Sequence, residues 1–113
     1  MKIDPDVYGV SSFFGIDPAL IQAVVAAEGD IVRAVRCSVP TVQTRDEALK
    51  ITARSAAHAM CDWIKGGGRE GVVHREAFIN FWGQRWAPPG AANDPQNLNV
   101  NWARNVVRLW REG

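Results

Sequence analysis

The chain has 113 residues, of which 47% are hydrophobic, and this length and composition suit one compact domain with a single core. Thirteen basic and twelve acidic residues give a formal net charge of +1, and no block of like charge stands out, which argues against a nucleic-acid partner. No apolar run approaches the roughly 20 residues that span a bilayer, and the start lacks the apolar run of a secretory signal. We therefore expect one domain over 1–113, made in the cytoplasm as a monomer that does not insert into membranes.

The cysteines and histidines offer no metal-ligand spacing, because neither a Cys-x-x-Cys pair nor a His-Glu-x-x-His segment occurs. We expect no metal and no cofactor. Cys37 and Cys61 are too few for a disulfide framework, and a buried thiol is the usual state of such a residue. A single disulfide between them stays open, since spacing along the chain does not fix the Cα separation that a bridge requires.

Helix start and stop signals are frequent and strand alternation is nearly absent, which predicts an all-α protein. Asp4-Pro5 and Asp17-Pro18 each place a capping acid before a proline, which suits the first helical position, and glycines follow where the helices should end. These signals predict helices over 5–14 and 18–28.

The middle of the chain holds the longest predicted helix. Thr44 followed by Glu47 has the spacing of a capping box, and one apolar face then continues to the glycines at 66–68. The segment 30–43 before it is ambiguous, since its valines suit a short helix or an extended stretch, but Pro40 ends any helix before that point.

A further helix is predicted from about Glu70 to Trp82, where Gly83 weakens its end. The loop "APPGAANDPQN" follows, and its length in so small a domain favours a functional role. A last helix near 100–111 carries apolar residues toward the core. We therefore expect five or six helices.

Glu28 stands out because it lies on the apolar stripe of the helix over 18–28, at steps of three, four and seven from Val25, Val24 and Ile21. Desolvation and the negative end of the helix dipole should both raise the pKa of this carboxyl group, as a general acid requires. The alternative is a surface glutamate that ends the helix in water or pairs with Arg33 or Arg36.

Two segments resemble a known family. The stretch "DPALIQAVVAAEG" is similar to the helix of lytic transglycosylases and related phage muramidases, in the lysozyme-like superfamily, that ends in the catalytic glutamate. Glu28 matches that glutamate, and Ser38 follows about where the family has a serine near the cleaved sugar. The stretch "FWGQRWAPPGAANDPQNLNVNWARNV" resembles the later segment that lines the glycan cleft in phage muramidases.

The resemblance implies a small lysozyme-like domain that cleaves the β-1,4 bond between N-acetylmuramic acid and N-acetylglucosamine in peptidoglycan, with Glu28 as general acid. For such an enzyme, the small size and the absence of a signal sequence suit a phage or prophage lysis protein (an endolysin) that reaches the wall through a separate membrane-permeabilising partner, or a virion-associated enzyme. The alternative is a non-catalytic structural or interaction module that kept the fold, and Gly29-Asp30 does stand where the family usually has Ser-Gly.

The reaction type depends on a second carboxylate. A hydrolase needs one about 5 to 5.5 Å from the acid for retention of configuration, or 6.5 to 9.5 Å for inversion. Asp30 and Asp94 are the candidates. A lytic transglycosylase, as the resemblance implies, needs only the acid, because the sugar's own substituents assist formation of an anhydro product.

Sugar binding favours flat aromatic rings with amides at their edges, and five tryptophans in this chain are many. We expect Trp86 in an exposed cleft position, because Gly83 and the following prolines take it off any regular helical face. Trp82 and Trp102 fall on apolar helical stripes and are expected in the core. The substrate contacts that we expect beside Glu28 are Ser38, Trp86, Asn93, Asp94 and Asn97.

Overall fold

The protein is a small all-α domain. The structure, a computed structural model, describes residues 2–86 and 101–112, with no strand in those ranges. Their elements, in chain order, are α1 (Pro5–Phe14), α2 (Pro18–Glu28), α3 (Ile31–Arg36), α4 (Arg45–Lys65), the 3-10 turn η1 (Val72–His74), α5 (Arg75–Trp86) and α6 (Trp102–Glu112).

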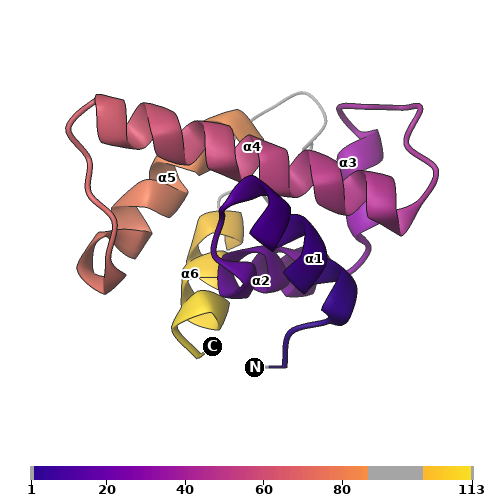
Figure 1. The fold of residues 1–113 in the computed structure, drawn as a ribbon, viewed down its shortest axis with the longest axis horizontal. Helices are drawn as coiled ribbons and strands as arrows, with labels where there is room; N and C mark the ends of the chain where they lie inside the picture. The colour runs from indigo at the N-terminus through magenta and orange to yellow at the C-terminus, as the bar shows by residue number, and fades with distance from the viewer. Residues whose placement is uncertain (1, 87–100, 113) are drawn as a thin grey trace.

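Helix α2 forms the centre of the core. Its six consecutive residues from Leu20 to Val25 are buried, so the helix is enclosed on nearly every side rather than along one stripe. It contacts α1, α3, α4 and α6, which surround it (Figure 1). The side chain of Asp17 accepts a hydrogen bond from the backbone N–H of Ala19 at 2.9 Å and so caps the start of α2.

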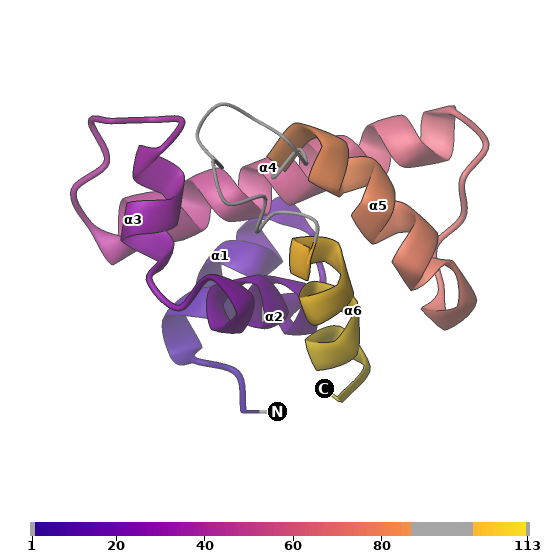
Figure 2. The same cartoon turned by 180° about the vertical axis from the view of Figure 1, so that it is seen from behind.

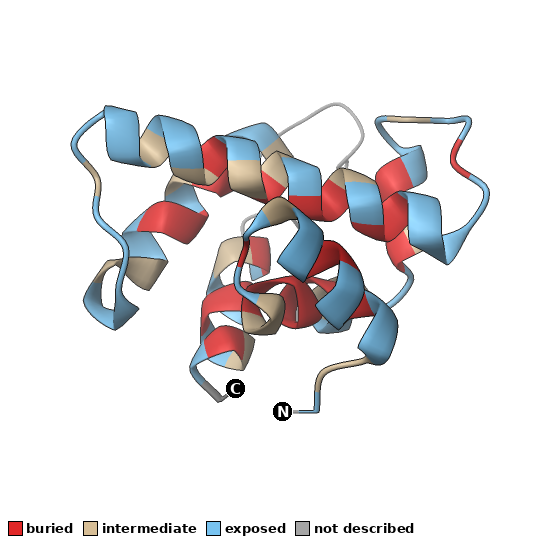
Figure 3. Cartoon of the chain, in the orientation of Figure 1, coloured by how far each residue is buried: buried red, intermediate tan, exposed pale blue. Residues whose placement is uncertain are grey.

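Helix α4 is the long helix that crosses α1, α3 and α5 (Figure 1). Its predicted capping box is present, since Thr44 Oγ1 accepts a hydrogen bond from the Glu47 N–H at 3.2 Å and donates one to Glu47 Oε1 at 3.1 Å. The helix buries one face and leaves the opposite face in solvent (Figure 3). The buried residues are small apart from one leucine, which allows the crossing helices to approach closely: Ala48, Leu49, Thr52, Ala53, Ala56 and Ala59.

The start of α1 differs from the prediction in one respect. Asp4 occupies the N-cap position, but its side chain makes no capping hydrogen bond. Instead, Asp4 Oδ2 accepts hydrogen bonds from Gln22 Nε2 at 3.3 Å and from Arg45 at 3.0 Å. The backbone N–H of Asp4 donates to Gln22 Oε1 at 3.0 Å, so this acid fastens α1 to α2 and α4.

Most predicted helix bounds are confirmed, and the ambiguous segment 30–43 contains the short helix α3. The expectation that Gly83 ends the fifth helix is wrong, because α5 continues through it to Trp86. The backbone at Gly83 is buried against Trp102, and a Cβ added there would lie 3.3 Å from Trp102 Cζ3. The glycine therefore serves close helix packing rather than helix termination.

Both cysteines are unpaired and exposed, so the expectation of buried thiols is wrong. Cys37 follows α3, and Cys61 lies on the outer face of α4. No helix within the described ranges is long and apolar enough to cross a membrane.

Two glycines give a paired test of the backbone. Gly15 ends α1 with φ 68° and ψ 29°, a left-handed conformation that penalises any Cβ, whereas Gly9 lies inside α1 with open space around it. We expect Gly15→Ala to lower the free energy of unfolding by about 1 kcal/mol. Gly9→Ala should raise it by about 0.5–1 kcal/mol, because alanine loses less backbone entropy in a helix. Urea unfolding measures both, and equal effects of the two substitutions would contradict the assigned backbone conformations.

Candidate active site around Glu28

Glu28 is the last residue of α2 and leaves the core where two other helices meet. Gly29 follows it at φ 75°, and its N–H closes the helix onto the Val25 carbonyl at 3.0 Å. Helix α6 packs against both α2 and α5 (Figure 2). The end of α5 and the first residue of α6 supply Trp86 and Trp102, which both act on the Glu28 carboxyl group.

Three tryptophans, Trp82, Trp86 and Trp102, form what we call the tryptophan cluster. The centroid of the Trp82 ring lies 5.5 Å from that of Trp86. It also lies 5.5 Å from that of Trp102, and these two rings meet edge to face. Trp82 and Trp102 are buried and Trp86 is half-buried. Trp86 Nε1 donates a hydrogen bond to Glu28 Oε1 at 3.4 Å, which is long for an N–H···O bond.

Burial raises the pKa of Glu28 above the ordinary value of a glutamate, and the indole N–H groups of Trp86 and Trp102 offset part of this rise. Desolvation is the largest cause, since the half-buried carboxylate loses water and the described part of the chain places no cation beside it. The carbonyls at the end of α2 act in the same direction. The pKa shift that we predicted from the apolar stripe therefore has the expected sign and cause.

The indole N–H of Trp102 has no acceptor in proper hydrogen-bond geometry within the described part of the chain, although the nitrogen is buried. It still lies close enough to Glu28 to favour the ionised carboxylate. The contact is thus a near approach of donor and acceptor rather than a formed hydrogen bond.

The neighbouring polar residues are engaged elsewhere. Asp30 caps α3 by accepting a hydrogen bond from the Arg33 N–H at 3.1 Å, and it is exposed. Arg36 Nε donates to the Val42 carbonyl at 2.7 Å. Across residues 2–86 and 101–112, no ion pair joins Glu28 to an arginine and no cluster of acidic, histidine or cysteine residues could hold a metal ion. The pairing of Glu28 with Arg33 or Arg36 is not found.

Of the other predicted substrate contacts, only Ser38 lies in the described residues. Ser38 is exposed in the turn after α3, where its N–H donates to the Val35 carbonyl at 3.0 Å, and no hydrogen bond joins it to Glu28 in the described residues. Asn93, Asp94 and Asn97 lie outside the described residues.

The tryptophan predictions were partly right. Trp82 and Trp102 are in the core, as their apolar stripes predicted. Trp86 was expected to be exposed and off any helix, but it ends α5 and is half-buried. The role of Trp102 beside Glu28 was missed, because the first residue of one helix and the last residue of another approach only through tertiary packing. For Trp86, a signal was available: it lies four residues after Trp82, so on a continuous helix the two rings share one face.

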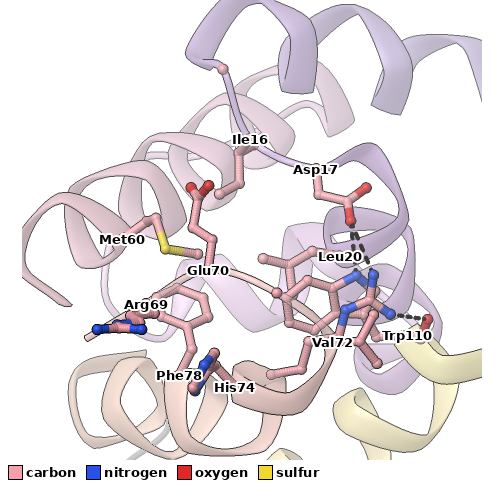
Figure 4. A pocket seen from close by; sticks show the side chains of 13 residues that line it. Ile16, Asp17, Leu20, Met60, Arg69, Glu70, Val72, His74, Phe78 and Trp110 are labelled. Carbon is pink, nitrogen blue, oxygen red and sulfur yellow. Dashed lines mark hydrogen bonds and ion pairs between the residues drawn. The ribbon is translucent and has the colours of Figure 1, made fainter. Parts of the chain in front are cut away.

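A cavity of about 350 Å³ lies at the other end of α2 from Glu28, between the start of that helix, η1 and α6 (Figure 4). Three of its lining groups, Asp17, Arg75 and Trp110, interact with one another. The Arg75 guanidinium lies 4.4 Å from the centroid of the Trp110 ring and 3.8 Å from Asp17, and Trp110 Nε1 donates to Asp17 at 3.0 Å. This network ties α5 to α2 and α6. We therefore place the candidate chemistry at Glu28.

Comparisons of the chain with protein-family models, curated proteins and solved structures found no match. The likeness to lytic transglycosylases thus rests on the two sequence segments quoted above. The chemistry of Glu28 and its aromatic neighbours carries the functional argument.

The raised pKa of Glu28 makes stability depend on pH. The folded protein retains this proton to a higher pH than the unfolded chain, so the free energy of unfolding should fall as pH rises from about 4.5, the ordinary glutamate value, through the raised pKa. Glu28→Gln removes this dependence. The stability difference, Gln minus Glu, should therefore grow with pH across this window and then level off.

Urea unfolding at a series of pH values measures that difference. Glu70→Gln, which neutralises an exposed acid in the segment between α4 and η1, away from Glu28, controls for the general loss of one negative charge. A difference for Glu28→Gln that does not grow with pH would show that the carboxyl group is not desolvated.

Proposed function

We propose that the protein cleaves the β-1,4 bond between N-acetylmuramic acid and N-acetylglucosamine in peptidoglycan, with Glu28 as the general acid. One observation carries the proposal: Glu28 is half-buried beside Trp86 and forms no ion pair in the described ranges, and this burial raises the pKa of its carboxyl group. Burying such a group without an ion pair is unfavourable, and perturbed carboxyl groups of this kind concentrate at catalytic sites. The resemblance of the segment ending in Glu28 to a catalytic helix supports the same role.

The proposed reaction begins with proton transfer. Glu28 protonates the glycosidic oxygen, the bond from the anomeric carbon to that oxygen breaks, and positive charge develops on the sugar ring. In a lytic transglycosylase, the muramic acid then closes on itself to give an anhydro sugar. In a hydrolase, a second carboxylate activates water or attacks the sugar.

The two schemes differ in what they need from this chain. Asp30 already caps α3 and is exposed, so it is poorly suited to be the second carboxylate. Asp94 remains the candidate for a hydrolase. Without it, the single acid Glu28 suffices for the transglycosylase scheme.

Glycan strands are the proposed partner. The half-buried ring of Trp86 offers an apolar surface beside the acid, and the buried rings of Trp82 and Trp102 support it. The resemblance suggests Ser38 near the cleaved sugar, and the amides of Asn93 and Asn97 are the expected polar contacts at the edges of the rings. We assign the protein to phage-type lysis of the wall or to the virion on the same basis. Carboxyl groups with a perturbed pKa concentrate at catalytic sites, and this favours an enzyme over a structural module.

Glu28→Gln tests the proposal. Glutamine keeps the shape of the side chain but has no proton to deliver, so degradation of purified peptidoglycan should fall by a factor on the order of 10² or more. The parent's activity should also decline as pH rises through the raised pKa of Glu28, because only the protonated acid is active. Loss of turbidity and mass analysis of released fragments are the measurements.

The control variant is Glu70→Gln, which should retain the parent's activity. Wild-type activity in folded Glu28→Gln would reject Glu28 as the general acid. No activity in the parent would reject the enzyme and leave the non-catalytic module.

Asp94→Asn separates the two reaction schemes. A two-carboxylate hydrolase should lose activity about as strongly as Glu28→Gln does, and the parent's products should carry reducing ends. A transglycosylase should keep near-normal activity in Asp94→Asn and release anhydro products. Anhydro products together with a strong loss in Asp94→Asn would contradict the single-acid scheme as drawn.

A further inference from the structure

Two indole N–H donors approach Glu28, and neither makes a strong hydrogen bond. Trp86 Nε1 lies 3.4 Å from Glu28 Oε1, and the buried Trp102 Nε1 has no acceptor in proper geometry within the described chain. Most buried polar groups have a partner, because an unpaired one loses its hydration without compensation. Such a donor beside an ionisable acid is suited to a negative charge that develops only during the reaction.

The third member of the tryptophan cluster holds the two donors in place. Trp82 is fully buried, and its own N–H donates to Ser55 Oγ at 3.0 Å, away from Glu28. The rings of Trp86 and Trp102 both contact Trp82. Gly83 lets the Trp102 ring reach α5, since even a Cβ at this position would lie 3.3 Å from Trp102 Cζ3. The positions of both donors are therefore fixed by packing before any substrate binds.

We propose that Trp86 and Trp102 are positioning residues whose paired N–H groups receive the negative charge that Glu28 acquires when it gives up its proton. This inference rests on the proposed function. The proton passes from Glu28 to the glycosidic oxygen, the electron pair of the broken C–O bond stays on that oxygen, and the charge left on Glu28 is met by the two indoles. Both indoles keep their protons, and only their N–H···O distances shorten.

Among residues 2–86 and 101–112, no charged side chain replaces the indoles in this task. The pKa of Glu28 responds to burial, to Trp86 and to Trp102, with no charge among its causes in the described residues. The charged groups nearest along the adjoining helices are directed elsewhere or exposed. Asp30 accepts from the backbone of Arg33, Arg85 pairs with Asp62 at 2.7 Å, and Arg104 is exposed on α6.

Trp102→Phe is the central variant, because it keeps an aromatic ring and deletes the N–H. The pKa of Glu28 should rise further, since a group that favours the ionised carboxylate is lost. For the same reason, kcat on purified glycan strands should fall roughly 10-fold or more with little change in KM, as expected for a donor to a charged group. A carbon-13 NMR titration of Glu28, assigned with Glu28→Gln, gives the pKa without any activity assay.

The direction of the pKa change separates this role from simple packing. If Trp102 only excluded water, its truncation would hydrate Glu28 and lower the pKa toward the ordinary value. Trp86→Phe should raise the pKa in the same way as Trp102→Phe. Trp82→Phe is the matched control, because it makes the same chemical change in the same cluster but removes an N–H that is bonded to Ser55, and it should not raise the pKa.

Replacing Trp102 by benzothienylalanine keeps the size and shape of the indole and substitutes sulfur for the N–H, so it serves where the phenylalanine variant fails to fold. An unchanged or lowered pKa in the folded variant would overturn the inference. If the pKa of Glu28 rises in the Trp102 variant but the parent protein degrades no peptidoglycan, the effect of the indoles on Glu28 stands and the proposed function is rejected instead.

Discussion

The burial of α2 is the constraint on which the rest of the structure depends. Its run from Leu20 to Val25 is enclosed by α1, α3, α4 and α6, so the helix has no solvated face along most of its length. A helix held in this way carries its final residue to the edge of the core rather than into open water. Glu28 is therefore only partly hydrated, and the raised pKa follows from its place in the fold.

Two opposing influences act on that carboxyl group. Burial favours the neutral acid, and the indoles of Trp86 and Trp102 favour the carboxylate. A general acid needs both, because it must hold its proton before the reaction and accept a negative charge after it. In the proposed reaction, the tryptophan cluster supplies neutral donors for the anion. A cation in the same place would lower the pKa and deprotonate the acid before the reaction.

The sequence alone predicted what local chemistry decides. The Asp-Pro pairs and their glycines defined α1 and α2, Thr44 and Glu47 marked the start of α4, and the apolar stripe placed Glu28 toward the core. Prediction failed where partners distant in the chain decide the outcome. Helix α5 continues through Gly83 because Trp102 packs there. This tertiary contact outweighs the low intrinsic helix propensity of glycine. Asp4 leaves its capping role because Gln22 and Arg45 compete for it. The approach of Trp102 to Glu28 likewise joins two helix ends that no spacing relates.

The pKa of Glu28 in the folded parent protein is the most direct test of this account. Carbon-13 labelling of the glutamates and an NMR titration, with the Glu28 signal identified by its loss in Glu28→Gln, would follow this one carboxyl group through its ionisation. The account predicts a midpoint above the ordinary value of about 4.5. A midpoint at or below that value would mean that Glu28 is a solvated charge at the end of α2, and it would contradict the assignment of this residue as a general acid.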